Sequence, residues 1–328
     1  MFFRVLSWIY ALASEARNLL FDRGVLKSRK LPVRVLSVGN ITAGGAGKTP
    51  LTLLIGEILS KNNVPFGVLS RGYGRTSKRP FAVQKCNGLT AREIGDEPKM
   101  IGERLGCPLG IGADRFRIGG LLLRKFGPRT LLLDDGFSHR GLARDCDIVA
   151  VDGHNPFGKN FLPHGTRREA LRRLARAHAF VITRNTAALE DADIRVTLGK
   201  YAPGRPVFTA ERVPCGIVAP DGSEHAMTEF VGTPCYLFSG IADGKRFEET
   251  ARTAGLTVTG CIPYSDHYIF DKDEIDHLRK NAGAGLFLTT EKDWWRLEGL
   301  REGLYYLRIS LRMDDPVSFE RFVVNAAT

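Results

Sequence analysis

An apolar run that leads directly into a glycine-rich loop limits the folds open to this chain. The run at residues 33–39 reads VRVLSVG, the loop after it reads NITAGGAGKTP, and residues 50–61 have the periodicity of a helix. A strand, a glycine-rich loop, a Lys-Thr pair and a helix, in this order, are typical of a phosphate-binding loop. The pattern predicts an α/β fold with a phosphate site at the end of an early strand.

The residues of this loop have separate chemical tasks. Glycines let backbone N–H groups approach phosphates, and the start of the next helix adds the positive end of its dipole. Lys48 can reach the terminal phosphates as a point charge, and the Thr49 hydroxyl can bind Mg²⁺. The strict pattern has glycine where this chain has Thr42, and related variant loops usually have a signature lysine where Ala43 stands. The predicted nucleotide-binding residues are Gly44, Gly45, Ala46, Gly47, Lys48, Thr49 and Pro50.

A glycine-rich turn with an incidental lysine is the alternative to a phosphate loop. The strand before it, the helix after it and Pro50 in the first helical turn disfavour that alternative. A second apolar run at 129–135 ends in Asp134 and Asp135, where an acidic element that helps to hold Mg²⁺ is expected. A strand ending in a charged turn would look the same. Together the two features predict a nucleoside triphosphate and Mg²⁺ as ligands.

Apolar runs separated by helical patterns extend along the chain. Such alternation predicts parallel βαβ units. Further strands are expected at 65–70, 146–152 and 179–184, and a helix at 114–125. Residues 201–235 are rich in proline and glycine, and strand and helix patterns resume after them. The expected parts are an amphipathic N-terminal helix (1–30), a phosphate-loop core (31–200), a β-type linker (201–235) and a smaller α/β unit (236–328).

The first 21 residues have helical periodicity, with charged residues outside one apolar stripe. No apolar run is long enough and sufficiently free of charge to span a membrane. A helix lying in a membrane interface and a helix packed on the domain both need such a stripe, so both interpretations stay open. The stripe consists of Val5, Ile9, Leu12, Ala13, Ala16, Leu19 and Leu20.

The composition narrows the class of partner. The 328 residues include 47 Lys and Arg against 36 Asp and Glu, a net charge of +11, which predicts an anionic partner: nucleic acid, phosphate or a membrane surface. An apolar content of 43% excludes a mainly disordered chain. The six cysteines are scattered without a Cys-x-x-Cys pair, which argues against a disulfide framework or a zinc site.

Polar runs follow several expected strands, where the ligand clefts of such sheets lie. The run SRGYGR contributes Arg71 and Arg75, and DDGFSHR contributes His139. Asp96 begins a helix in GDEP, where a carboxylate is also a routine N-cap. A lone histidine such as His267 is more often structural than catalytic.

Residues 162–176 are rich in arginine. On a helix, Arg168, Arg172 and Arg176 would share one face, with Glu169 among them. The face can be a solvated basic surface, or it can contact a phosphate or anionic lipid.

Taken together, these runs resemble the tetraacyldisaccharide 4′-kinase family, the lipid A 4′-kinases of Gram-negative bacteria. The matching runs are VGNITAGGAGKTP, SRGYGR, GDEP, DDGFSHRGLARDCDIVAVD, LP-G--RE, SGIAD--RF, SDH and TTEKDWWRL. The resemblance implies transfer of the γ-phosphate of ATP to the 4′-hydroxyl of a tetraacyl glucosamine disaccharide 1-phosphate. It also implies a P-loop NTPase-like parallel sheet with flanking helices, joined by a two-stranded linker to a second α/β unit.

The resemblance further implies a peripheral or monotopic enzyme at the cytoplasmic face of the bacterial inner membrane, with its N-terminal helix on the anionic membrane surface. It implies neither a nucleic-acid partner nor an obligate protein partner.

The family resemblance also assigns roles to individual residues. It implies that Lys48 and Thr49 are the loop lysine and the Mg²⁺-binding hydroxyl, and that Asp96 is a catalytic base paired with His267. The remaining implied site residues are Asp134 and Asp135 as the acidic pair near the metal, His139 and Arg168 in the cleft, and Glu169 in the cleft and as a further Mg²⁺ ligand. The chain departs from the family at Ser138, His164, Thr166, Asp243, Gly244 and Tyr268.

Two other classes of function compete with the kinase. A nucleotide switch or chaperone-type ATPase with a protein or metal partner would explain the loop and the acidic strand, but not the amphipathic N-terminus or the other matching runs. A nucleic-acid binder would explain the charge, but the chain has no recognition motif and no platform of aromatic and basic residues.

Overall fold

The computed structural model describes residues 2–86, 88–185, 191–241, 243–266 and 268–328. Its strands are β1 (Arg34–Gly39), β2 (Phe66–Ser70), β3 (Phe81–Val83), β4 (Leu109–Ile111), β5 (Thr130–Leu133), β6 (Cys146–Asp152), β7 (Ala179–Arg184), β8 (Val207–Val218), β9 (Glu224–His225), β10 (Pro234–Ser239), β11 (Thr257–Pro263), β12 (Leu286–Thr290) and β13 (Leu304–Met313). Its α-helices are α1 (Phe2–Asp22), α2 (Lys48–Lys61), α3 (Ala91–Ile94), α4 (Asp96–Leu105), α5 (Arg115–Phe126), α6 (Ala192–Tyr201), α7 (Gly244–Thr253), α8 (Lys272–Ala282), α9 (Glu291–Arg296) and α10 (Pro316–Ala327).

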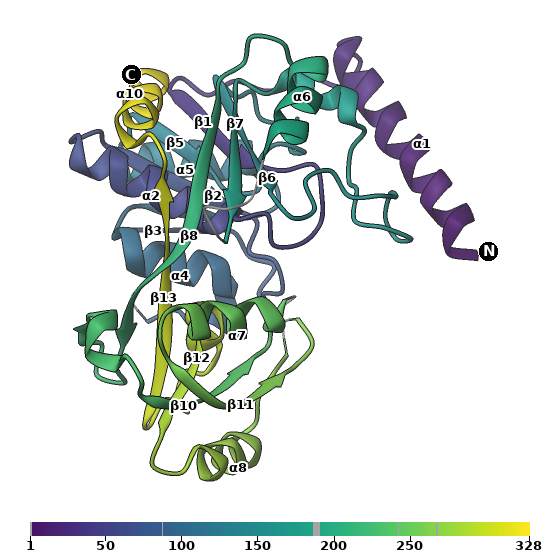
Figure 1. Ribbon diagram of the computed structural model, residues 1–328. Coiled ribbons are helices and arrows are strands. Elements are labelled where there is room, and N and C mark those ends of the chain that lie inside the picture. Colours follow the sequence, from purple (N-terminus) through teal and green to yellow (C-terminus); the bar gives the residue numbers. More distant parts are fainter. Residues whose placement is uncertain (1, 87, 186–190, 242, 267) are drawn as a thin grey trace.

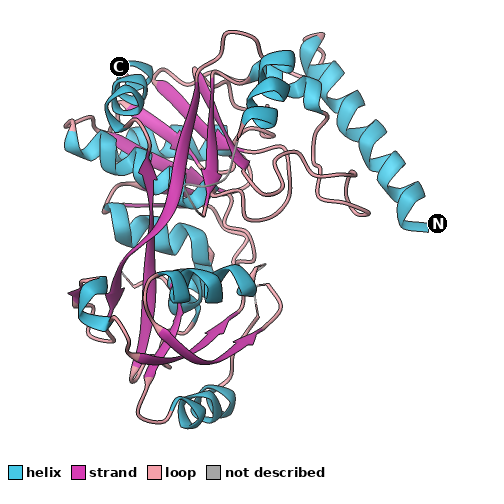
Figure 2. Cartoon of the chain, in the orientation of Figure 1, coloured by secondary structure: helices cyan, strands magenta, loops and turns pink. Residues whose placement is uncertain are grey.

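One continuous sheet connects the described parts of the chain (Figure 1; Figure 2). The strand order is β11-β10-β12-β13-β8-β7-β6-β1-β5-β2-β4-β3, with β9 beside β8. Neighbours are parallel from β8 to β4 and again from β11 to β13, while β8 and β13 run antiparallel and join the two parallel blocks. The predicted α/β class is therefore confirmed.

The strand β1 has a buried side chain on both faces of the sheet. Leu36 and Val38 pack with α2 in one apolar cluster, and Val35 packs with α5 in another. Leu36 pairs with Leu132 of β5 and with Cys146 of β6. Because all three strands are parallel, their carboxyl ends meet at one edge, where the phosphate loop and the acidic pair emerge.

The predicted linker contains the long strand β8. Its first residues pair with β7 of the core, and its later residues pair with β13. The last helix, α10, returns to the core, where the Thr130 hydroxyl donates to the Ala327 carbonyl at 2.9 Å and the rings of Phe208 and Phe319 lie 5.1 Å apart. The last helix of the expected unit 236–328 therefore packs on the core.

Residues 162–176 do not form a helix on which the three arginines would share one face. Only Leu171–Arg176 form a short 3-10 helix, so Arg168 does not share a helical face with Arg172 and Arg176. The backbone N–H groups of Arg168 and Glu169 both donate to the Ile41 carbonyl, at 2.7 and 3.3 Å. These donors are thereby used to pair the segment with the chain that enters the phosphate loop.

Helix α1 (purple in Figure 1) lies at the outer edge of the core. Its buried residues are polar, namely Ser7 and Asn18, whereas its apolar stripe is exposed, with Leu12 at 67% and Trp8 beside it at 72%. The interpretation that the stripe packs on the domain is therefore wrong. None of the described helices has the length and apolar character needed to cross a membrane.

Candidate functional site

The phosphate loop connects β1 to α2 over residues 40–47. Gly44 and Gly47 have φ values of 105° and 76°, a backbone region that favours glycine. A Cβ atom at Gly44 or Gly45 would meet no atom within 4 Å, so the space beside this part of the loop is open. Helix α2 begins at Lys48 and directs the positive end of its dipole toward the loop. Such an arrangement suits a phosphate.

Lys48 faces the acidic pair that follows β5. Its Nζ atom lies 3.8 Å from Asp135 Oδ1, and Arg168 Nη1 donates to both carboxylate oxygens of Asp135 at 2.9 and 3.1 Å. Burial alone would raise the pKa of Asp135, but Lys48 and Arg168 hold it below its usual range. The structure thus brings three of the predicted residues, Lys48, Asp135 and Arg168, into contact.

Asp134 is the buried member of the pair. Its two carboxylate oxygens accept hydrogen bonds from the Thr52 and Ser70 hydroxyls, at 3.2 and 3.3 Å. Burial raises the pKa of Asp134 to about 7, and the nearby carboxylates of Glu97 and Asp135 add to this effect. The carboxylate is therefore short of positive charge in its own surroundings.

This shortage fits a divalent cation, which would hold Asp134 in its ionised form. Mg²⁺ usually binds proteins through one or two carboxylates together with substrate phosphates. The described residues contain no group of three or more His, Cys, Asp or Glu that could hold a metal ion. Asp134 fits the role of a single carboxylate ligand, whereas the metal role of Thr49 stays a prediction.

Glu169 lies close to the phosphate loop through its backbone, but its carboxylate has other partners. Oε1 accepts from the Ser138 hydroxyl at 2.5 Å, and Oε2 accepts from Arg176 Nη2 at 2.7 Å and from Asn18 Nδ2 at 3.2 Å. Asn18 belongs to α1. The metal role of Glu169 therefore stays a prediction, and the contact that the structure shows is with α1.

Asp96 begins α4 and is held by two cations of α9. Arg296 donates to Asp96 Oδ2 from Nε at 2.8 Å and also from Nη2, and Lys292 Nζ lies 3.8 Å from the same oxygen. Arg296 is itself fixed, because its Nη1 donates to Asp293 Oδ1 at 2.7 Å and to the Gly240 carbonyl at 2.6 Å. The carboxylate of Asp96, in the core, is thus held by ion pairs with the smaller α/β unit.

Comparison with known proteins decides the family. Residues 1–328 match the family model described as tetraacyldisaccharide-1-P 4′-kinase. The chain belongs to this family.

Relatives named tetraacyldisaccharide 4′-kinase cover nearly the whole chain. The protein from Syntrophus aciditrophicus is 34% identical over 98% of this chain and 91% of its own length, and that from Chlorobaculum tepidum is 35% identical over 94% and 91%. The crystal structure of LpxK from Aquifex aeolicus, described as an apo form in complex with ATP, has a TM-score of 0.77 and 28% identity over 98% of each chain. The P-loop NTPase-like architecture inferred from the family resemblance is thereby confirmed.

Not every residue expected from the 4′-kinase resemblance faces the loop. Arg75 donates instead to two carbonyls of its own loop, those of Arg79 and Lys78. His139 lies beside arginines, and burial lowers its pKa to about 4, so the ring is neutral near pH 7. The positive charge of Arg71 lies close enough to Arg115 to lower the pKa of Arg115. His267 lies outside the described residues, so its pairing with Asp96 stays a prediction.

Several cations near the site lie in no motif that the sequence marks as functional. Arg115 is buried at the start of α5, within electrostatic reach of the acidic pair, and burial lowers its pKa to about 10. Arg212 of β8 donates to the Gly45 carbonyl of the phosphate loop at 2.5 Å and to the Thr183 hydroxyl at 3.0 Å. Lys292 and Arg296 lie in the run TTEKDWWRL, which supported the 4′-kinase family without assigning them a role.

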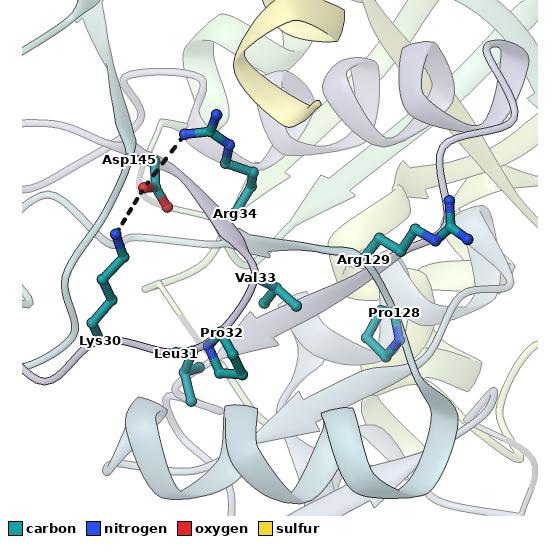
Figure 3. A pocket seen from close by; sticks show the side chains of 8 residues that line it. All are labelled: Lys30, Leu31, Pro32, Val33, Arg34, Pro128, Arg129 and Asp145. Atoms are coloured by element: carbon teal, nitrogen blue, oxygen red, sulfur yellow. Dashed lines mark ion pairs between the residues drawn. The ribbon is translucent and has the colours of Figure 1, made fainter.

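A cavity of about 570 Å³ lies at the other end of the strands (Figure 3). It is lined by Lys30, Leu31, Pro32, Val33, Arg34, Pro128, Arg129 and Asp145. Lys30 and Arg34 both pair with Asp145 in its lining, at 4.0 and 3.8 Å. Because β1 starts at this end and the phosphate loop follows its last residue, the cavity is not part of the candidate site.

Proposed function

We propose that the protein transfers the γ-phosphate of ATP to the 4′-hydroxyl of a tetraacyl glucosamine disaccharide 1-phosphate, a step of lipid A biosynthesis. The observation that carries the proposal is the contact between the phosphate-loop lysine and the acidic pair after β5, together with membership of the 4′-kinase family. The likeness to an ATP complex of LpxK supports ATP as the donor.

Phosphoryl transfer depends on positioning and on neutralising charge. The loop N–H groups and Lys48 bind the phosphates, and Mg²⁺ held by Thr49 and Asp134 would neutralise charge on them. The 4′-oxygen attacks the γ-phosphorus, the bond to the bridging oxygen breaks, ADP leaves, and Asp96 accepts the hydroxyl proton with help from His267. Arg296 and Lys292 hold the carboxylate of Asp96 in place at the start of α4.

We propose that the four expected parts of the chain act as units in this reaction. Asp96 comes from the core, whereas Arg296 and Lys292 come from the smaller unit. Closure of the two units around the substrates then completes the site, as in other enzymes that exclude water by domain motion.

The direct test is incubation of the purified protein with γ-labelled ATP, Mg²⁺ and the tetraacyl disaccharide 1-phosphate in mixed micelles. The proposal predicts label at the 4′-position of the lipid. Label found only as free phosphate would support a nucleotide switch and would reject the kinase.

The exposed stripe of α1 supports a peripheral location at the cytoplasmic face of the bacterial inner membrane. Trp8 and Leu12 project from the molecule, and the basic residues Arg4, Arg17 and Arg23 lie in or just after the same helix. A helix with an apolar face and basic neighbours is typical of segments that lie in the interface of an anionic bilayer.

Flotation with vesicles that contain anionic phospholipid tests this location. The full chain should float with the vesicles, and Trp8→Ser with Leu12→Ser should reduce the bound fraction at least about fivefold, because each substitution removes apolar area from the bilayer. Unchanged binding of the double variant would refute the membrane role of the stripe.

A further inference from the structure

Helix α1 docks on the core through its polar face. The Ser7 hydroxyl donates to the Phe161 carbonyl at 2.7 Å, and the Ser14 hydroxyl donates to the Arg168 carbonyl at 3.1 Å. Glu15 pairs with Arg172 and, at 2.8 Å, with Arg173. An interface of this kind specifies the position of a helix, because hydrogen bonds and ion pairs have stricter geometry than apolar contacts.

Asn18 is the most deeply buried residue of this interface, with 1% of its surface exposed. Its Nδ2 donates to Glu169 Oε2 at 3.2 Å, and its Oδ1 accepts from Arg176 Nη1 at 3.0 Å and from Arg140 Nη1 at 3.2 Å. Both ends of the amide are therefore used. A side chain of α1 thus completes a buried polar network inside the core.

The same network holds the chain that enters the phosphate loop. Residues 166–169, here called the bracing segment, pair with residues 41–43. Ala43 N–H donates to the Thr166 carbonyl at 2.5 Å, and Arg168 N–H donates to the Ile41 carbonyl at 2.7 Å. The side chain of Arg168 continues to Asp135, which in turn faces Lys48. A contiguous set of contacts therefore leads from α1 to the lysine of the phosphate loop.

We propose that α1 stabilises the nucleotide-binding conformation of the phosphate loop as well as contacting the membrane, with Asn18 as the positioning residue. Seating of α1 on the bracing segment raises the affinity of the loop for the nucleotide. The exposed face of the helix contacts lipid, and the buried face sets the phosphate site. This inference rests on the proposed binding of ATP at residues 44–50.

Energetic coupling between two sites is reciprocal, so the proposal predicts effects in both directions. Asn18→Leu removes both ends of the amide and should raise the Kd for Mg·ATP, and the KM for ATP, at least about fivefold. The kcat at saturating ATP and the binding to anionic vesicles should stay within about twofold. Conversely, saturating Mg·ATP should slow tryptic cleavage within α1 of the wild-type protein, because nucleotide binding favours the seated helix.

Two further variants separate positioning from loss of structure. Asn18→Asp keeps the acceptor for Arg140 and Arg176 but places a carboxylate oxygen, in place of the donor, against Glu169 and the Ser14 carbonyl, so it should raise the Kd for Mg·ATP at least as much as Asn18→Leu. The matched control is Leu12→Ser on the exposed face, which should weaken vesicle binding and leave the Kd for Mg·ATP unchanged.

The inference is overturned if Asn18→Leu binds Mg·ATP as tightly as the wild type, or if its kcat falls while its KM for ATP stays constant. It is also overturned if Mg·ATP leaves the cleavage of α1 unchanged. Failure of the wild-type protein to bind Mg·ATP would instead reject the proposed function on which the inference rests. If Asn18→Leu does not fold, Ser14→Ala replaces it, since it removes one bond to the bracing segment and should raise the Kd about twofold.

Discussion

Two adjacent carboxylates of the candidate site have opposite electrostatic surroundings. Asp135 is flanked by Lys48 and Arg168, whereas Asp134 is bonded to the hydroxyls of Thr52 and Ser70. The pKa of Asp135 is therefore lowered and that of Asp134 is raised to about 7. The two aspartates can thus have different roles. The Asp135 carboxylate orients Lys48 and Arg168, and the Asp134 carboxylate is available to a cation.

The partly buried ring of His139 makes stability depend on pH. Burial lowers its pKa to about 4, whereas an unfolded histidine has a pKa of about 6.5. As pH falls through this window, the unfolded chain takes up a proton that the folded protein does not, so the free energy of unfolding decreases. His139→Gln should reduce this decrease between pH 7 and pH 5 by on the order of 1 kcal/mol, measured by urea denaturation at both values. The same pH dependence in the variant and the wild type would contradict the assignment, and the exposed His154→Gln serves as the control.

At the scale of elements, the end of β1 fixes where the site begins. Gly39, its last residue, lies so close to Phe137 that a Cβ atom would come within 2.5 Å of the Phe137 Cβ and 2.6 Å of its backbone nitrogen. Phe137 follows the acidic pair in the chain. The close approach of these two backbones therefore sets the spacing between the phosphate loop and the acidic pair.

Gly39→Ala should consequently lower the free energy of unfolding by about 2 kcal/mol, because the backbone must move to admit the methyl group. Gly199→Ala in α6 is the control, since nothing lies within 4 Å of its Cβ position. That substitution should raise the free energy of unfolding by about 0.5–1 kcal/mol, since alanine is the better helix former. Equal effects of the two substitutions in chemical denaturation would reject the packing argument.

The elements around the phosphate loop could be predicted because their signals are local. Apolar runs marked β1, β5 and β6, and the loop itself has a recognisable pattern. The path of residues 162–176 could not be predicted, because residues 166–169 pair with residues 41–43, which only the folded chain brings close. The same limit applies to Arg212 and Arg296, whose partners lie more than a hundred residues away.

At the scale of the whole molecule, several connections join the core to the smaller α/β unit. They include the antiparallel pair of β8 and β13, the packing of α10 on the core, and the ion pairs between α9 and the start of α4. In these ion pairs, Lys292 lies 3.3 Å from Glu97 and Arg296 holds Asp96. These ion pairs involve Asp96, the proposed base, so the relative position of the two units affects both stability and chemistry.

Removing Arg296 from these ion pairs should lower the free energy of unfolding. Arg296→Gln leaves the fully buried Asp293 without its cation and should lower the free energy of unfolding by about 3 kcal/mol. Arg279→Gln is a matched control, because Arg279 also pairs with an aspartate three residues before it, but at the surface. Its effect should stay below about 1 kcal/mol. Similar losses of unfolding free energy for both variants in urea denaturation would show that the buried ion pairs of Arg296 stabilise the protein no more than a surface pair does.

The central claim is that Asp96 and the phosphate loop form one site for phosphoryl transfer. The most direct test is the turnover of Asp96→Asn with ATP and the tetraacyl disaccharide 1-phosphate, measured together with the Kd for Mg·ATP. The account predicts that kcat falls at least about 100-fold, as for loss of a general base, while the Kd changes less than about threefold. Turnover close to that of the wild type would contradict it.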